Sequence, residues 1–444
     1  MLEKLLNKSK EFGFSDLQVS VTSNIGPEIN VFKGNIDKNF IGSSKKYIIK
    51  GVIGDKASTL VVEKNEGDFT DEEISQYLSK LKEDVLSITA PFKNSIFEGS
   101  KEYPVVKEKE FDLDKYSTED KIKLIKDVEA KCLAYDPRIE LVPYCSYSET
   151  ISSLEIANTK GLNLKKVNRY GVIAVEVTAG ASKDDPQKQL DFKVEVKRKF
   201  SDFKADDIVK EVCDKALAKL GASPCASNVY PVLMDKEAMR SLLNGFFSMF
   251  TGEAALRNLT ALNGKLGQKV VSEKITILDD PLNEDAIEQS AFDDEGVATS
   301  RKEVISSGVF KMFLHNLKTA QAFNTQPTGN GTLGGNIGPN NFHIANGDTS
   351  PSEAIKGIKE GLLIKDLQGL HAGLNPISGD FSAQSSGFLI KDGKIDRPVT
   401  LIVVSGNFLK MLNEVGCVCN DLEFGYDGFG SPSVLFNGLP ISGK

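Results

Sequence analysis

Apolar and polar residues alternate in blocks along the first half of the chain, and stretches with helical spacing flank each block. The first block opens with an amphipathic helix at about 1–12 and continues with strand-like runs at Leu17–Val21 and Tyr47–Ile53. A second helix is expected after Thr70, because Thr70 and Glu73 have the spacing of a capping box. These patterns predict a helix, several strands and a closing helix.

The next block repeats this order. A helix begins near Ser117, alternating strands follow, and the closing helix carries apolar residues at a spacing of four over 208–220. Lys33–Gly34 in the first block and Lys160–Gly161 in the second mark matching turns. The sequence therefore predicts a duplicated α+β unit. The charged run in the last strand, Lys193–Lys199, alternates with apolar residues and reads as a solvated face.

The second half is richer in glycine and in short β-like runs, which predicts a mostly antiparallel, β-rich domain with a few helices. The fold class is α+β: two small helix–strands–helix units at 1–90 and 115–222, a linker at 91–114, and the β-rich domain at 225–444. The glycine-dense segment Thr328–Pro339 is predicted to be a loop. No helix pattern follows it, so a phosphate cradle is not expected.

One helix of the last domain has two unlike faces. Asp235 is a plausible N-cap, and the apolar residues spaced three and four apart from Met239 to Phe250 form one buried stripe. The other face carries small polar residues that include Ser241, Asn244 and Gly245. This pattern predicts a core helix beside a cavity or a close-packed backbone.

Charge and composition narrow the function. The net charge of −8 disfavours nucleic acid and anionic membranes as partners, and no run approaches the roughly 20 apolar residues of a membrane helix. The six scattered cysteines show no disulfide framework, which favours a reducing, cytoplasmic location.

An ordered series of motifs covers about 230–444: GKLGQKVVSEKITILDDP, AFDDEGVATSRKEVISSGVF, QPTGNG, NPISGDFSAQSSGFLIKDGKI, VSGNF and GSPSVLFNGLPISG. This series resembles the TldD/PmbA (TldE) family, whose members are named as modulators of DNA gyrase and as peptide-maturation proteases. The likeness is weaker in the first 220 residues, where the two predicted α+β units agree with it.

The resemblance implies where a metal site would be. In the TldD branch this helix carries His-Glu-x-x-x-His, and two histidines bind a metal while the glutamate activates water. Asn244, Gly245 and Met249 occupy those positions here. The pattern resembles the PmbA/TldE branch, which implies no metal in this chain and zinc only in a TldD-type partner. Cys417 and Cys419 fall near a further TldD ligand, and neither is assigned a role.

A second group of residues lies close together in the sequence LHAGLNPISGDFS. His371, Asn375, Gly379, Asp380 and Phe381 are predicted to lie near a peptide cleft, with a tight turn at Gly379 and the Asp380 carboxylate capping N–H groups. A Ser-His-Asp arrangement is an alternative, although no nucleophile-elbow motif supports it.

The acidic run FDDEGVATS at 292–300 lacks the alternating spacing of a calcium loop. It is predicted to be a solvated or capping turn.

The predicted function is that of the non-metal subunit of a cytoplasmic TldD/TldE-type metallopeptidase that degrades or matures small unfolded peptides. The chain would pair with a TldD-type partner or with a second copy of itself, and it would hold peptide as an added strand. Two alternatives stay open. One is an independently active hydrolase that uses His371, Asp380 or an unrecognised site, and the other is a non-enzymatic regulatory protein.

Overall fold

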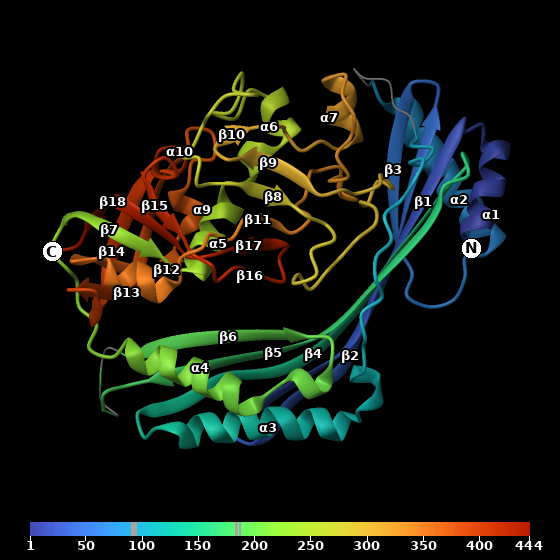
Figure 1. Cartoon of the computed structure of the whole chain (residues 1–444). Coiled ribbons are helices and arrows are strands. Elements are labelled where there is room, and N and C mark those ends of the chain that lie inside the picture. The colour runs from blue at the N-terminus through green and yellow to red at the C-terminus, as the bar shows by residue number, and fades with distance from the viewer. Residues whose placement is uncertain (90–95, 183–184, 186–187) are drawn as a thin grey trace.

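The computed structural model describes residues 1–89, 96–182, 185 and 188–444, and Figure 1 shows its layout. Its first half is built on one antiparallel sheet with the order β3-β2-β1-β4-β5-β6. The strands are β1 (Asp16–Phe32), β2 (Asn35–Ile53), β3 (Lys56–Glu63), β4 (Ile139–Asn158), β5 (Asn163–Ala179) and β6 (Gln189–Lys197).

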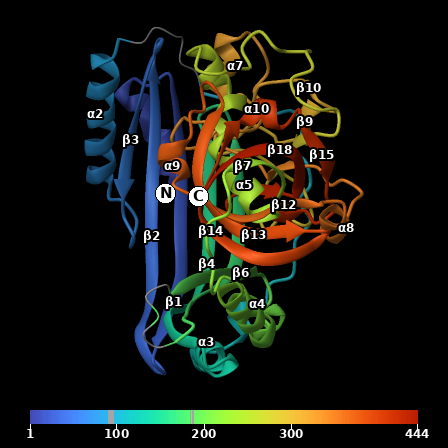
Figure 2. The same cartoon turned by 90° about the vertical axis from the view of Figure 1, so that its left-hand side faces the viewer.

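Two helix pairs cover this sheet at different places. The helices α1 (Leu2–Ser9) and α2 (Asp71–Ser87) share one apolar core with β1 and β2, whereas α3 (Thr118–Tyr135) and α4 (Ala205–Ala218) share a second core with β4 and β5. In Figure 2, α2 lies near one end of the long strand β2 and α3 near the other end. The observed order of elements is the predicted one, with helix, three strands and helix occurring twice.

The two repeats share one sheet because β1 pairs with β4. The pairing runs antiparallel from Gln18 opposite Asn158 to Val31 opposite Cys145. The spatial order of the six strands is therefore symmetric about this central pair. Lys33–Gly34 and Lys160–Gly161 lie in the two matching turns, between β1 and β2 and between β4 and β5. The predicted unit boundaries stay predictions.

The capping signals in the sequence are confirmed. The Glu73 N–H donates to the Thr70 hydroxyl at 3.1 Å, and the Thr70 N–H donates to the Glu73 carboxylate at 2.7 Å. Ser117 caps α3 in the same way with Asp120. Each box satisfies N–H groups that the first helical turn leaves without partners.

The predicted linker carries neither helix nor strand over residues 96–112; its residues 91–95 lie outside the described part. It runs along the C-terminal domain, where the Tyr103 hydroxyl donates to the Gly296 carbonyl at 2.8 Å. The Lys109 ammonium donates to the carbonyls of Glu284 and Ala286. These contacts fix the linker against the domain that follows.

The C-terminal domain contains two further sheets. The first has the order β14-β13-β12-β7-β18-β15, and β14 also pairs with β18, so five strands close on themselves. Its strands are β7 (Asn228–Met234), β12 (Glu360–Gln368), β13 (Asp380–Lys391), β14 (Lys394–Asn407), β15 (Val415–Val418) and β18 (Val434–Ser442).

The second sheet has the order β10-β9-β8-β11-β17-β16. Its strands are β8 (Ile277–Asp279), β9 (Lys302–Ser306), β10 (Val309–Phe310), β11 (Phe342–Ile344), β16 (Glu423–Phe424) and β17 (Phe429–Ser431). In the C-terminal domain β7–β12 and β11–β17 are parallel, and the remaining strand pairs are antiparallel. The predicted α+β class with mostly antiparallel sheets is confirmed.

Short helices complete the domain: α5 (Lys236–Gly245), α6 (Gly252–Leu256), α7 (Leu317–Ala322), α8 (Pro351–Lys356), α9 (Leu370–Gly373) and α10 (Phe408–Met411). The glycine-dense segment 328–339 forms a loop, as predicted. Within the described ranges, no helix combines the length and apolar character that crossing a membrane requires.

The closeness of β1 to β4 can be tested at Gly26. A Cβ atom at Gly26 would lie 1.7 Å from the Glu149 carbonyl oxygen of β4, and backbone cannot move aside cheaply. Gly26→Ala should therefore lower the free energy of unfolding by about 1–3 kcal/mol, the usual cost of overpacking. The matched control is Gly42→Ala, because Gly42 pairs with Gly26 and its Cβ would meet only ordinary contacts near 4 Å. Thermal unfolding of both variants measures the difference. Equal midpoints would show that β1 and β4 can move apart at Gly26 without loss of stability.

Candidate functional site

Asp235, directly before helix α5, fixes the N-terminus of the helix. Its carboxylate accepts the Glu237 N–H at 3.1 Å, which makes Asp235 the N-cap, as predicted. The same side chain pairs with Lys365 of β12 at 2.6 Å, and the Asp235 N–H donates to the Ile364 carbonyl. One residue therefore caps the helix and attaches it to the sheet.

The apolar face of α5 is buried against the closed sheet, and Ala238, Met239, Leu242 and Leu243 belong to that core. The α-helix ends at Gly245, earlier than the apolar stripe to Phe250 predicted, and Phe247–Phe250 form a 3₁₀ turn. Aromatic packing accounts for the change: Phe246 stacks on Phe408 at 4.6 Å between ring centroids, and Phe247 packs edge-on against Phe342 at 5.1 Å.

The polar face of α5 lines a cavity of about 450 Å³. Ser241, Asn244 and Gly245 form one wall, and the Asn244 amide donates to the Asp427 carboxylate at 3.3 Å. The other wall comes from α9 and the residues after it: Leu370, His371, Leu374 and Pro376. Both predicted alternatives occur: the helix borders a cavity, and Gly245 packs so closely that a Cβ there would lie 2.2 Å from the Leu374 Cδ1 atom. The mixed apolar and polar lining of the cavity is typical of ligand pockets.

The residues present do not form a metal site. Asn244 offers only a neutral amide, Gly245 has no side chain, and Met249 is fully buried in the apolar core rather than exposed to the cavity. Within the described ranges, no three His, Cys, Asp or Glu side chains form a group that could hold a metal ion.

Cys417 of β15 and Cys419, directly after it, lie elsewhere. Cys419 is fully buried in a small separate core with Leu233 and Ile390, and Cys417 packs at its edge. Burial raises the pKa of the Cys419 thiol to about 12, which disfavours the thiolate that a metal needs. Neither cysteine lines the α5 cavity.

The turn after α9 has the predicted shape with different hydrogen bonds. Gly379 adopts a φ of 85°, and the Asn375 side chain, not Asp380, accepts the N–H groups of Ile377 and Ser378. The Asp380 carboxylate accepts hydrogen bonds from Asn407 at 2.9 Å and Ser378 at 2.8 Å, and these bonds lower its pKa. Asp380 is thus a stabilised anion that shapes the turn.

Among the predicted cleft residues, His371 lines the cavity with Asn244 and Gly245. Asn375, Gly379 and Asp380 form the adjoining turn, and Phe381 is buried beneath Phe246. Because Asp380 is engaged by Asn407 and Ser378, its hydrogen bonds give a Ser-His-Asp relay no support. His315 and His343 are 8% and 2% exposed, so they are packed in the interior.

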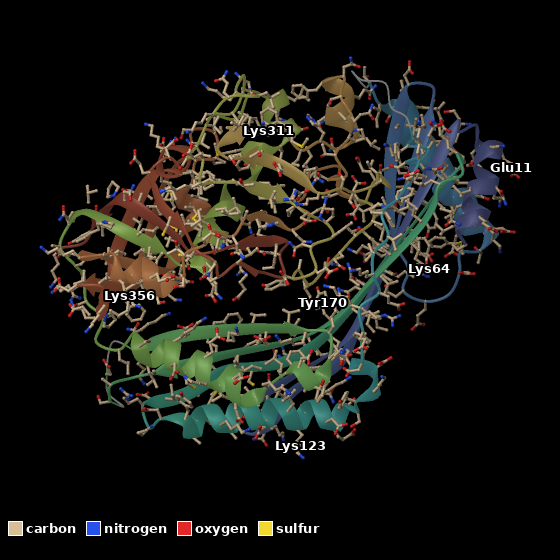
Figure 3. All side chains as sticks on the ribbon, viewed as in Figure 1. Glu11, Lys64, Lys123, Tyr170, Lys311 and Lys356 are labelled. Atoms are coloured by element: carbon tan, nitrogen blue, oxygen red, sulfur yellow. The ribbon has the colours of Figure 1, made fainter. Side chains whose placement is uncertain are left out.

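Sequence reasoning missed Asp427, at the tip between β16 and β17. It lines the α5 cavity and also a second cavity of about 310 Å³, whose walls include Lys166, Glu288 and Tyr426. Tyr170 of β5 lies at the same junction between sheet and C-terminal domain (Figure 3). No local signal marks Asp427, because its neighbours on α5 are far away in the sequence.

The acidic run at 292–300 proves to be a capping turn. Asp293 is 4% exposed and accepts the N–H groups of Glu295, Val297 and Gly331. The Glu295 carboxylate accepts the Leu317 N–H at the start of α7. The capping alternative is therefore confirmed for Asp293.

Comparison with known proteins agrees with this architecture. Residues 227–443 match the model of the PmbA/TldA metallopeptidase C-terminal domain, and residues 111–220 match that of the central domain. A solved structure from Thermotoga maritima, described as a candidate modulator of a DNA gyrase, is 31% identical, covers 99% of both chains and superposes with a TM-score of 0.88. This chain belongs to the PmbA/TldD family.

Other members are more distant. TldE from Thermococcus kodakarensis is 23% identical over 99% of both chains with a TM-score of 0.89, which shows the shared fold. The metalloprotease PmbA of Escherichia coli O157:H7 is 24% identical over 70% of each chain. A PmbA homolog of Buchnera aphidicola is 26% identical, and the match spans 60% of this chain and 58% of that protein. The chain thus spans little more than half of some curated relatives.

The buried carboxyl of Asp293 predicts a pH dependence of stability. Burial raises its pKa to about 7, so folding favours the neutral acid. The stability this contributes is present below the unfolded pKa near 3.9 and is lost as pH rises through about 7. Asp293→Asn removes this titration, so its midpoint of thermal unfolding should fall less than that of the wild type between about pH 4 and pH 8. Parallel curves for the two proteins would contradict the assignment.

Proposed function

We propose that this chain is a PmbA/TldE-type, non-metal subunit that holds unfolded peptide at the α5 cavity for a metallopeptidase whose zinc is in a TldD-type partner. The observation that carries the proposal is the lining of the cavity. By the resemblance, Asn244 and Gly245 stand at metal-binding positions of the TldD branch, and here they line a cavity. The described residues contain no group of side chains that could hold a metal ion there.

The chemistry of the lining supports a peptide ligand. Leu370, Leu374 and Pro376 supply apolar surface for a side chain, and Asn244 and Asp427 supply a donor and an acceptor for peptide N–H and C=O groups. The volume of about 450 Å³ fits a short segment of peptide rather than a folded domain. The chain thus binds and positions peptide while the partner cleaves it in the cytoplasm.

The purified chain should contain no stoichiometric zinc and should not cleave unfolded casein, with or without a chelator, because no described group of side chains can hold the ion. Adding a TldD-type chain should produce cleavage that the chelator abolishes. Elemental analysis and a casein assay measure both results. One tightly bound zinc per chain contradicts the proposal, and chelator-resistant cleavage favours an independent hydrolase with His371 as the first residue to replace. If the partner cleaves casein in a zinc-dependent way at the same rate with and without this chain, the result favours a regulatory role for the chain.

Peptide binding should depend on the cavity wall. Leu374→Asp places a charge in the apolar part of the lining and should weaken the binding of an unfolded casein fragment about tenfold. Leu266→Asp is the matched control, because Leu266 is 56% exposed and outside the cavity. Fluorescence anisotropy with a labelled fragment measures both affinities, and equal losses would exclude the α5 cavity as the peptide site.

We also propose that the chain dimerises, either with a TldD-type chain or with itself. The first part of β2 supports this: β3 pairs with β2 only over residues 46–53, and Ile36, Phe40 and Ile41 of β2 are 44%, 49% and 71% exposed.

Sedimentation of the chain alone at micromolar concentration should give twice the mass of one chain, unless the TldD-type partner is required. Ile41→Lys should shift the assembly toward monomer, because it places a charge in an apolar contact. A monomer both alone and with the partner would contradict the proposal.

A further inference from the structure

A further cavity, of about 510 Å³, lies between the first half of the chain and the C-terminal domain. One wall comes from α4 and β6, and the opposite wall comes from α5, β12 and β13. Its volume is within the range of small-molecule sites. It lies at the N-terminal end of α5, whereas the proposed peptide cavity lies at the C-terminal end.

Strand β6 contributes two exposed apolar side chains to this cavity. Leu190 and Phe192 line it and are 52% and 47% exposed. The alternate residues Asp191 and Lys193 form ion pairs with Lys219, directly after α4, and Glu211 of α4, at 2.9 and 2.8 Å. The Asp191–Lys219 pair also lines the cavity. The charged face of β6 was expected to be solvated, but here it covers a helix. Because apolar side chains normally face the helix, the reversed arrangement points to a ligand for Leu190 and Phe192.

Both signs of charge line the same space. Lys215 of α4 pairs with Glu237 of α5 at 3.1 Å, and this ion pair joins the two walls. Lys365 lies beside Asp366 on β12, and Lys365 pairs with Asp235. Ammonium and carboxylate groups are thus both within reach of one small molecule, and their mutual neutralisation disfavours a ligand of a single charge.

We propose that this cavity is a second binding site, which takes a short free peptide with both termini charged and an apolar side chain. The side chain packs against Leu190 and Phe192. The free ammonium pairs with the Asp366 carboxylate, and the free carboxylate joins the Lys215 ammonium beside Glu237, while Lys365 stays on Asp235. This site differs from the α5 cavity in its residues and in its ligand, since a short peptide with free ends is not an unfolded chain.

The test is isothermal titration calorimetry of the full-length chain with alanyl-phenylalanine. We expect saturable binding of about one molecule per chain. N-acetyl-alanyl-phenylalanine amide, which has the same side chains and no terminal charges, should bind about tenfold more weakly. Saturable binding that is equal for both compounds would overturn the proposal, as would no binding of alanyl-phenylalanine at millimolar concentration.

Variants locate the site. Phe192→Ala should weaken alanyl-phenylalanine binding about fivefold by removing the aromatic wall. The matched control Phe323→Ala should leave it unchanged, because Phe323 is 44% exposed and lies outside this cavity. Both replaced side chains are exposed, so both variants should fold. His371→Ala should also leave binding unchanged. If His371→Ala lost dipeptide binding, or if Phe192→Ala kept the wild-type affinity, the dipeptide would bind elsewhere. Either result would overturn the proposal.

Discussion

The ion pair between Asp235 and Lys365 determines where α5 lies, and both cavities of this part of the molecule depend on α5. The Asp235 carboxylate is shared between the Lys365 ammonium and the N–H of the first helical turn. Removing it would leave an N–H group and a partly buried ammonium without their acceptor, so the helix start would lose two kinds of support at once. After the cap, burial of Met239, Leu242 and Leu243 in the core fixes the rotation of the helix about its axis.

That orientation separates two kinds of surface. The apolar side of α5 is fully committed to the core, so Asn244 and Gly245 have to face the cavity under Asp427. At the other end, Glu237 faces the interdomain space through its pair with Lys215. A helix rise of 1.5 Å per residue puts these two ends about 10 Å apart. A ligand at either end would therefore contact the same short helix.

Local signals predicted much of this from sequence. The N-caps at Thr70 and Asp235 could be identified because the residues of each cap are within a few positions of each other. The end of α5 could not, because stacking of Phe246 on Phe408 depends on residues far away in the chain. Asp427 was missed for the same reason. The reversed polarity of β6 was also hidden, since alternation shows that a strand has two faces without showing which face meets a helix.

The seam between β1 and β4 also sets an order of events during synthesis. The Leu17 N–H bonds to the Thr159 side chain, 142 residues further along the chain. At roughly 5–20 residues per second, the ribosome needs on the order of ten seconds to deliver β4 after β1. During that interval the hairpin of β1 and β2 has one edge without its strand, which is a template for pairing with other chains.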